Sequence, residues 1–273
     1  MLLSAHELFG DPESGTAVAA FNAITLEHAE AIVTAAEETG APVVMQLSQN
    51  AIAFHRHPEA IAAAMVAVAR ASSAPVVLHL DHITDAELAF RTLDLGFSSV
   101  MFDGATQDYD ANVTATRQVA EWGAARGIWV EAELGEIGGK EGAHAPGVRT
   151  DPDEAARFVA DTGVDSLAVA VGSSHAMTTK SAALDLDLIE RIAGRVDVPL
   201  VLHGSSGVSD DLLARAADAG MRKINIGTAL NIAFTDAVRE WLEENDGVDP
   251  RKYIAPGRDA MARTCAHYLE VLR

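Results

Sequence analysis

The sequence is poor in cysteine and has no long apolar run. Its single cysteine, Cys265, excludes an intramolecular disulfide and fits a reducing compartment. No apolar stretch approaches the roughly 20 residues that a membrane-spanning helix needs. The first residues, MLLSAHELFGDPESG, are acidic and lack the apolar segment of a signal peptide. We therefore expect a cytoplasmic protein without a membrane segment.

Basic residues are also scarce. The 273 residues include 20 Lys and Arg against 40 Asp and Glu, which gives a formal net charge of -20. A polyanionic surface repels both nucleic acid and anionic membranes, so we expect neither as a partner. An anionic substrate would need hydrogen-bond donors gathered at one place.

Short β-branched runs alternate with longer, Ala-rich amphipathic segments along the whole chain. Examples of the amphipathic segments are 26–40, 57–73 and 210–220. Glycines typical of helix ends follow several such segments, and Asp151-Pro152 and Ser209-Asp210 are typical helix starts. The predicted strands are 16–22, 42–48, 75–82, 98–103, 128–134, 165–171, 199–203 and 223–227.

Apolar strands separated by helices predict a parallel sheet covered by helices. Eight such units favour an α/β fold of the (β/α)8 TIM barrel type, formed by residues 1–273 as a single domain with a C-terminal helical extension. An open dinucleotide-binding sheet would want G-x-G-x-x-G after the first strand, which AFNAIT lacks. Two long segments, 135–150 and 172–185, follow predicted strands and are expected at the active-site end of the barrel.

Polar residues end most of the predicted strands. In a barrel these positions converge, so core filler is a poor explanation for them. His79 alone would be an ordinary packed histidine, and we expect His6, His28, His55, His57, His144 and His267 at the surface. The strand-end residues are Asn22, Gln46, Ser48, Asp81, His82, Asp103, Glu133, Ser174, His175, His203, Asn225 and Thr228.

Three of these residues are histidines from the third, sixth and seventh predicted strands. His82, His175 and His203 would supply three imidazoles around one point, which is typical of a zinc site with positions left for substrate. The turns His203–Gly207 and Asn225–Thr228 each lead into a helix and offer backbone N–H groups to a phosphate. Such donors would hold an anion in an otherwise acidic protein.

The ordered motifs AFN, QLS, HLDH, VEAELGEIGGKE, TGVDSLAVAVGSSH, VLHGSSG and KINIGTAL resemble the class II, metal-dependent ketose-bisphosphate aldolases. The resemblance continues to DPRKYIAPGRDAM near the C-terminus. It implies reversible cleavage of a ketose 1,6-bisphosphate, most simply fructose 1,6-bisphosphate, to dihydroxyacetone phosphate and glyceraldehyde 3-phosphate. Tagatose 1,6-bisphosphate or another phosphorylated ketose is the alternative substrate.

The resemblance also implies roles for individual residues. Asp81 is similar to the acid/base at the C4 oxygen, and Glu141 to a second proton-exchanging residue on a glycine-rich loop. His82, His175 and His203 match the Zn²⁺ ligands, with Glu133 at an alternative metal position. Arg258 is similar to a basic residue that reaches the second phosphate from a partner subunit, which implies a homodimer or higher oligomer. Substrate and phosphate binding, with Na⁺ or K⁺ nearby, fall to Asn22, Gln46, Ser48, Gly172, Gly204, Ser206, Asn225 and Thr228.

The chain departs from the family pattern at two places. Ala176 stands where the family usually has Gly, with no Tyr nearby, and Ser205 replaces the second Gly of the HGGSG turn. A non-catalytic sugar-phosphate-binding relative is therefore an alternative. A Schiff-base aldolase would need a strand-end lysine, but Lys223 opens the eighth predicted strand at the opposite face. A metal-dependent hydrolase would want H-x-H on the first strand, which is absent.

Overall fold

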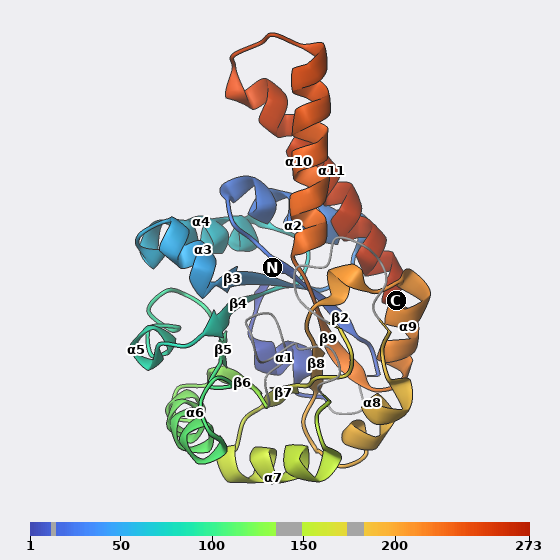
Figure 1. The fold of residues 1–273 in the computed structure, drawn as a ribbon. Helices are drawn as coiled ribbons and strands as arrows, with labels where there is room; N and C mark the ends of the chain where they lie inside the picture. The colour runs from blue at the N-terminus through green and yellow to red at the C-terminus, as the bar shows by residue number, and fades with distance from the viewer. Residues whose placement is uncertain (12–14, 135–148, 174–182) are drawn as a thin grey trace.

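The computed structural model describes residues 1–11, 15–134, 149–173 and 183–273. Eight parallel strands close into a barrel, because each pairs with the next along the chain and β9 pairs with β2. The predicted TIM barrel is confirmed, with the strands in the centre and the helices around them (Figure 1). The strands are β2 (Val18–Asn22), β3 (Val43–Ser48), β4 (Val76–Ile83), β5 (Ser99–Phe102), β6 (Trp129–Glu133), β7 (Ser166–Ala168), β8 (Leu200–Leu202) and β9 (Met221–Ile226).

The helices follow the strands as the amphipathic segments predicted. Asp151 caps α7 by accepting from the backbone N–H groups of Asp153 and Glu154, and Gly40 and Gly163 end α2 and α7 at positive φ. The helices are α1 (Ala5–Phe9), α2 (Leu26–Thr39), α3 (Gln49–Phe54), α4 (Pro58–Ala71), α5 (Ala86–Ala89), α6 (Tyr109–Ala124), α7 (Pro152–Thr162), α8 (Leu186–Ala193), α9 (Asp210–Asp218), α10 (Thr228–Glu244) and α11 (Pro250–Val271). No helix among the described residues is long and apolar enough to span a bilayer.

A small apolar cluster closes the N-terminal end of the barrel. The two-residue strand β1 (Leu2–Leu3) pairs with the start of β4 and leads into α1. Leu8 and Phe9 of this segment pack against Trp129 and other inward side chains of the lower barrel. Figure 1 shows α1 lying across the middle of the barrel. The apolar lower layer separates the polar side chains above it from solvent at this end.

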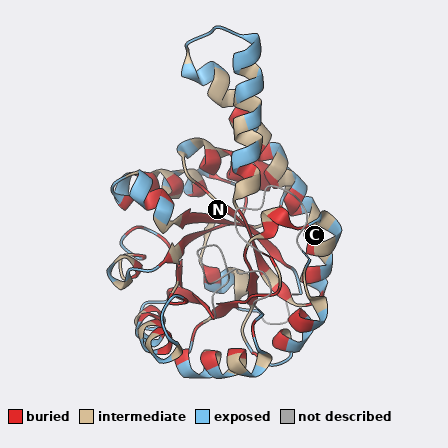
Figure 2. Ribbon diagram, viewed as in Figure 1, coloured by how far each residue is buried: buried red, intermediate tan, exposed pale blue. Residues whose placement is uncertain are grey.

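The last two helices form the predicted C-terminal extension. Both α10 and α11 run beyond the barrel, and their connected ends project away from it (Figure 1). Only Leu230 of α10 is buried, and the projecting part is coloured mainly intermediate and exposed (Figure 2). Trp241 and Tyr253 meet there with ring centroids 6.0 Å apart. The C-terminal half of α11 returns to the barrel, where Met261 and Cys265 are fully buried.

Candidate active site

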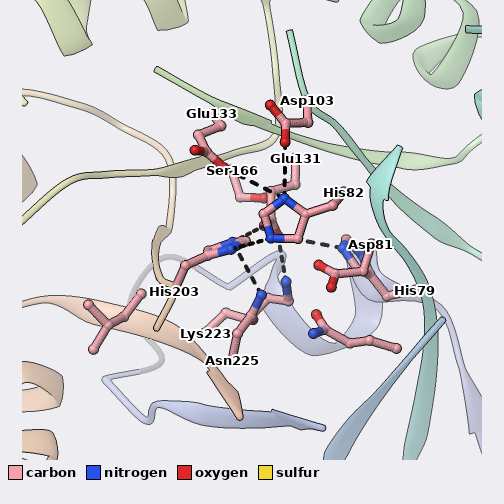
Figure 3. A network of polar contacts seen from close by, with 12 residues as sticks. His79, Asp81, His82, Asp103, Glu131, Glu133, Ser166, His203, Lys223 and Asn225 are labelled. Atoms are coloured by element: carbon pink, nitrogen blue, oxygen red, sulfur yellow. Dashed lines mark hydrogen bonds and ion pairs between the residues drawn. The ribbon is translucent and has the colours of Figure 1, made fainter. Parts of the chain in front are cut away.

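Polar side chains fill the upper half of the barrel interior. Successive side chains of a strand point to opposite faces, so every second one points into the barrel. Trp129, Glu131 and Glu133 of β6 point inward, and so do Lys223 and Asn225 of β9. Figure 3 shows these Glu, Lys and Asn side chains converging with those of β4 and of the residues that directly follow β5 and β8. The catalytic end of a TIM barrel is built from the C-terminal ends of its strands, which is where this cluster begins.

A backbone irregularity at the end of β4 turns two adjacent side chains toward the same point. Successive residues of a regular strand face opposite sides of the sheet, so Asp81 and His82 could not both point inward. The register of β4 against β5 shifts between Leu80 and Ile83, and His82 has φ +49°. Positive φ is strained for a residue with a side chain, and such strain is concentrated at functional sites.

His82 and His203 present their ring nitrogens to each other. Nε2 of His82 and Nδ1 of His203 lie 2.9 Å apart, and the rings meet edge to face with centroids at 4.7 Å. On its far side, His82 donates its Nδ1–H to Asp103 Oδ2 at 3.1 Å, and Glu133 Oε2 lies 3.9 Å from the same nitrogen. Burial opposes the charged form of His82, but Asp81, Asp103 and Glu133 outweigh it and raise the pKa of His82 to about 10.

A carboxylate also lies on the far side of His203. His203 Nε2 is 3.2 Å from Glu131 Oε1, and Lys223 donates to Glu131 Oε2 at 2.8 Å. All three side chains are at most 4% exposed. Asn225 Nδ2 is also 3.2 Å from His203 Nε2. The lower edge of the site is thus a buried ion pair in contact with an imidazole.

Asp81 lies beside the two histidines and is 2% exposed. Asn22 donates its Nδ2–H to Asp81 Oδ2 at 2.7 Å, whereas Oδ1 has no hydrogen-bond partner among the described residues. Burial favours the neutral acid, but His82, His203, Lys223 and the Asn22 hydrogen bond together keep the pKa of Asp81 below its usual value. One carboxylate oxygen is therefore hydrogen-bonded, and the other is buried without a partner among the described residues.

Asn22 also links Asp81 to the middle of the barrel. Gln46 Nε2 donates to Asn22 Oδ1 at 3.3 Å, and Gln46 pairs with His79 in the register of β3 and β4. His79 is 1% exposed and contacts Ser99 Oγ through Nδ1 at 2.7 Å. Burial first, and then the charge of Lys223, holds the pKa of His79 well below its usual value. His79 is therefore a neutral packed histidine, as the sequence suggested.

The turns after β8 and β9 meet at the start of α10. Gly204 has φ +69° and leads into the single 3-10 turn η1 (Ser205–Gly207). The Ser206 hydroxyl accepts from the backbone N–H of Ala229, the second residue of α10. Thr228 opens that helix, so its first N–H groups and dipole face the upper end of the barrel. This arrangement can bind an anion.

Three other predicted residues have roles visible in the fold. The Ser48 hydroxyl caps α3 by accepting from the N–H of Ala51 at 3.2 Å. Gly172 follows β7 with φ +117°, where an added Cβ would overlap the carbonyl oxygen of Ala183. Arg258, on α11, pairs with Glu30 of α2 at 3.0 Å, outside the histidine cluster. Glu141 and His175 lie outside the described residues, and so does Ser174.

Two expectations from the sequence are wrong. Lys223 does not open a strand at the far face: β9 begins two residues earlier, at Met221, so Lys223 reaches the middle of the barrel interior. His28 is not a surface residue, because it is only 5% exposed and stacks on Phe234 with ring centroids 6.1 Å apart. Sequence reasoning also overlooked Glu131, although alternation from Glu133 along β6 was a usable signal.

In the part of the chain that the structure describes, two groups of side chains have the spacing of metal ligands. One is Asp81, His82 and His203, and the other is His82, Asp103 and Glu133, with the ligand atoms of each group within 4.8 Å of one another. Imidazole nitrogens with carboxylates behind them are a frequent zinc donor set, because the carboxylate fixes the ring and leaves the opposite nitrogen for the metal. His82 and His203 both have this arrangement, so the residues present fit a divalent cation.

Known proteins match this chain over nearly all of its length. A family model described as fructose-bisphosphate aldolase class-II matches residues 8–273. A fructose-bisphosphate aldolase of Geobacillus stearothermophilus is 39% identical over 269 residues, which cover 96% of this chain and 94% of the relative. A 6-phospho-5-dehydro-2-deoxy-D-gluconate aldolase of Bacillus subtilis (strain 168) is 39% identical over 252 residues, with 91% and 87% covered. The crystal structure of the YdjI aldolase from Escherichia coli K12 superposes with a TM-score of 0.88 at 31% identity, covering 100% of this chain and 97% of that one.

Proposed function

Because the chain belongs to the class II fructose-bisphosphate aldolase family, we propose that it cleaves fructose 1,6-bisphosphate reversibly to dihydroxyacetone phosphate and glyceraldehyde 3-phosphate. The reaction breaks the bond between C3 and C4. It needs a group that removes the proton of the C4 hydroxyl and a site that stabilises the negative charge left on the triose fragment. The upper barrel supplies candidates for both.

His82, His203 and His175 are the proposed zinc ligands. The observation that carries this assignment is the 2.9 Å approach of His82 Nε2 and His203 Nδ1, with Asp103 and Glu131 behind the two rings. His175 is included on the family resemblance alone. When bound, Zn²⁺ supplies Lewis-acid stabilisation of the charge that develops on the substrate's carbonyl oxygen. Glu133 lies 3.9 Å from His82 and is proposed as a ligand at an alternative position.

Asp81 is the proposed acid/base at the C4 oxygen. Asn22 orients it by donating to Oδ2, which leaves Oδ1 to take the proton in cleavage and return it in addition. The bulge at His82 supports this role, because it places Asp81 beside the two histidines. Asp103 and Glu131, and not Asp81, are the carboxylates hydrogen-bonded to the imidazole rings. Glu141 remains the proposed proton donor to the triose fragment, by resemblance.

The dihydroxyacetone phosphate end is proposed to bind at the turns after β7, β8 and β9. The N-terminus of α10, with Thr228 first and the Ser206 hydroxyl beside it, supplies N–H donors and a favourable dipole. Gly172 and Gly204 allow the backbone to approach closely, since both have positive φ. Asn225, Gln46 and Ser48 complete the proposed binding set, with Na⁺ or K⁺ proposed beside the phosphate.

The most specific part of the proposal is the identity of the sugar phosphate that is cleaved. The relative named for fructose bisphosphate and the relative named for 6-phospho-5-dehydro-2-deoxy-D-gluconate are each 39% identical to this chain. Fructose 1,6-bisphosphate is placed first because the family model carries that name and the first relative covers more of the chain. Tagatose 1,6-bisphosphate and 6-phospho-5-dehydro-2-deoxy-D-gluconate are the alternatives. All of them present a phosphate and a carbon–carbon bond near a carbonyl.

We further propose a cytoplasmic homodimer or higher oligomer built from residues 1–273 as one domain. Within its own chain Arg258 pairs with Glu30, and both side chains are partly exposed. Arg258 is proposed to reach the second phosphate in a partner subunit. The projecting end of α10 carries Leu242, 48% exposed, and the connection to α11 carries Val248, 91% exposed, and we propose that the assembly buries both. Sedimentation velocity distinguishes a monomer from an oligomer.

The deciding experiment is a substrate panel with enzyme-coupled detection of triose phosphate, before and after chelation. Chelated protein should lose cleavage activity, and added Zn²⁺ should restore it. His203→Ala should lose zinc and activity together. His267→Ala is the matched control, because His267 is exposed and contacts Asp210 of α9 and the ring of Tyr268, away from the histidine cluster.

Retention of full activity after chelation would contradict metal dependence. Cleavage of one sugar phosphate in the panel, and not of the others, would identify the substrate. Zinc binding without turnover on any substrate would instead favour the non-catalytic sugar-phosphate-binding relative.

A further inference from the structure

A buried ion pair lies beneath the proposed metal centre, and its cation, Lys223, has no part in the roles assigned above. Glu131 of β6 and Lys223 of β9 meet inside the barrel, and Glu131 also contacts His203 of the segment after β8 (Figure 3). We propose that Lys223 and Glu131 are positioning residues, which hold the Nε2–H of His203 and thereby present its Nδ1 as the ligand atom. The inference rests on the proposed function in one respect, namely that His203 binds the metal.

The two oxygens of Glu131 are divided between two partners. Oε2 accepts from Lys223 Nζ at 2.8 Å, and Oε1 lies 3.2 Å from His203 Nε2. Glu131 and His203 are 1% and 0% exposed, so water does not compete for either contact. Lys223 therefore stabilises the negative charge of Glu131 and fixes the orientation of its carboxylate. The second oxygen then faces the imidazole of His203.

This arrangement selects one tautomer of His203. A neutral imidazole has one N–H and one lone pair, and a carboxylate oxygen facing a ring nitrogen requires the N–H at that nitrogen. The proton then lies on Nε2, and the lone pair lies on Nδ1, the atom 2.9 Å from His82 Nε2. The charged contact outweighs the neutral Asn225 amide near the same nitrogen, because hydrogen bonds to ions are roughly twice as strong.

Asn225 adapts to that choice. In the structure, Asn225 Nδ2 faces His203 Nε2, and Asn225 Oδ1 has no hydrogen-bond partner among the described residues. Exchanging the amide oxygen and nitrogen, which have nearly the same shape, turns an acceptor toward the Nε2–H. The tautomer set by Glu131 is thus compatible with every described contact on this side of the ring.

The test replaces Glu131 with a neutral isostere and reads the tautomer and the metal affinity separately. In Glu131→Gln, Lys223 still requires an acceptor, so the Gln carbonyl turns toward Lys223 and its NH₂ group faces His203 Nε2. The His203 proton then moves to Nδ1. Nitrogen-15 histidine spectra of the metal-free protein, assigned with His203→Gln, report which ring nitrogen carries the proton. Titration with Zn²⁺ alone reports affinity.

Metal-free wild type should carry the His203 proton on Nε2, and Glu131→Gln should carry it on Nδ1. Zinc affinity should fall about 10–100-fold in Glu131→Gln, the usual cost of losing a carboxylate behind a ligand histidine. Ser166→Ala is the matched control. It removes another buried barrel contact, the hydrogen bond from Trp129 Nε1–H at 2.8 Å, and should lower thermal stability without changing zinc affinity.

A wild-type proton on Nδ1 would overturn the proposal, and that measurement needs no variant to fold. Unchanged zinc affinity in folded Glu131→Gln would also overturn it, while the proposed function would stand. An equal loss of affinity in Ser166→Ala would show that general destabilisation, and not the tautomer, weakens binding, and would count against positioning. Failure of wild type to bind zinc would refute the proposed function instead, and the spectra would still decide the tautomer.

Discussion

Replacing Lys223 by methionine should destabilise the metal-free protein strongly. Methionine keeps the unbranched shape of the side chain, one atom shorter, but removes the cation 2.8 Å from Glu131 Oε2, and Glu131 is only 1% exposed. At that distance, with an effective dielectric constant of about 20, the lost attraction is about 6 kcal/mol. Relief of the desolvation of Lys223 offsets part of it, so we expect the free energy of unfolding to fall by about 3–5 kcal/mol.

Burial limits how far a neighbouring imidazole can replace the lost cation. His79 Nε2 lies 3.9 Å from Glu131 Oε2, and the part of its lowered pKa that Lys223 causes disappears in the variant, but burial, the larger cause, still opposes the charged form. Glu131→Gln combined with Lys223→Met removes both charges, so the double variant should recover much of the loss. Urea denaturation followed by circular dichroism measures all variants without metal, because bound metal would add its own stabilisation.

The surface pair of Arg91 and Glu59 provides the matched control. It is similarly short, at 2.6 Å, but both side chains are well exposed, and Arg91→Met should leave the urea midpoint unchanged. A loss below about 1 kcal/mol in Lys223→Met would refute the reasoning, since it would mean that water reaches Glu131 or that its charge is carried elsewhere. A double variant as unstable as Lys223→Met would refute it too.

Three further outcomes are expected. Asp81→Asn should lower kcat about 10²–10⁴-fold while zinc affinity stays within a few-fold of wild type, and parallel loss of zinc would contradict a proton-transfer role. Cys265, fully buried with its thiol pKa raised by burial, should react with a thiol reagent such as Ellman's reagent only after unfolding, so rapid reaction of native protein would show that α11 opens. Gly172→Ala, at φ +117° and against the Ala183 carbonyl, should cost about 1–3 kcal/mol or more of stability in urea titrations, and a neutral effect would show that the turn rearranges freely.

The eight barrel strands and most helices could be predicted from the sequence because their signals are local. Apolar runs of five to eight residues, Gly40 at the end of α2 and Asp151 at the start of α7 each depend on a few neighbouring residues. β1 has only two residues, too few for a periodic pattern, and the short helix α3 lies in a segment that was not predicted as helical. Both depend on contacts with distant parts of the chain.

The site could be predicted less completely, because strand boundaries decide which residues face inward. Starting the last strand at Lys223 placed that lysine at the wrong end, whereas two more residues bring it beside Glu131. The inward orientation of both Asp81 and His82 depends on a bulge that no local sequence pattern predicts. The burial of His28 arises from Asn231 and Phe234 of α10, about 200 positions away, which a reading of neighbouring residues could not supply.

The segment Leu2–Phe9 has a consequence for how the barrel can be altered. It is the floor of a chamber in which the Lys223–Glu131 ion pair interacts strongly because water is excluded. A chain without this segment would keep every side chain of the upper site, but the apolar layer of Val18, Val44, Val77 and Trp129 would lose its cover from below. Solvent entering from below would hydrate Glu131 and Lys223 and loosen the ring of His203. A short N-terminal segment thus keeps water from Glu131 and Lys223, although it packs only against the apolar layer below them.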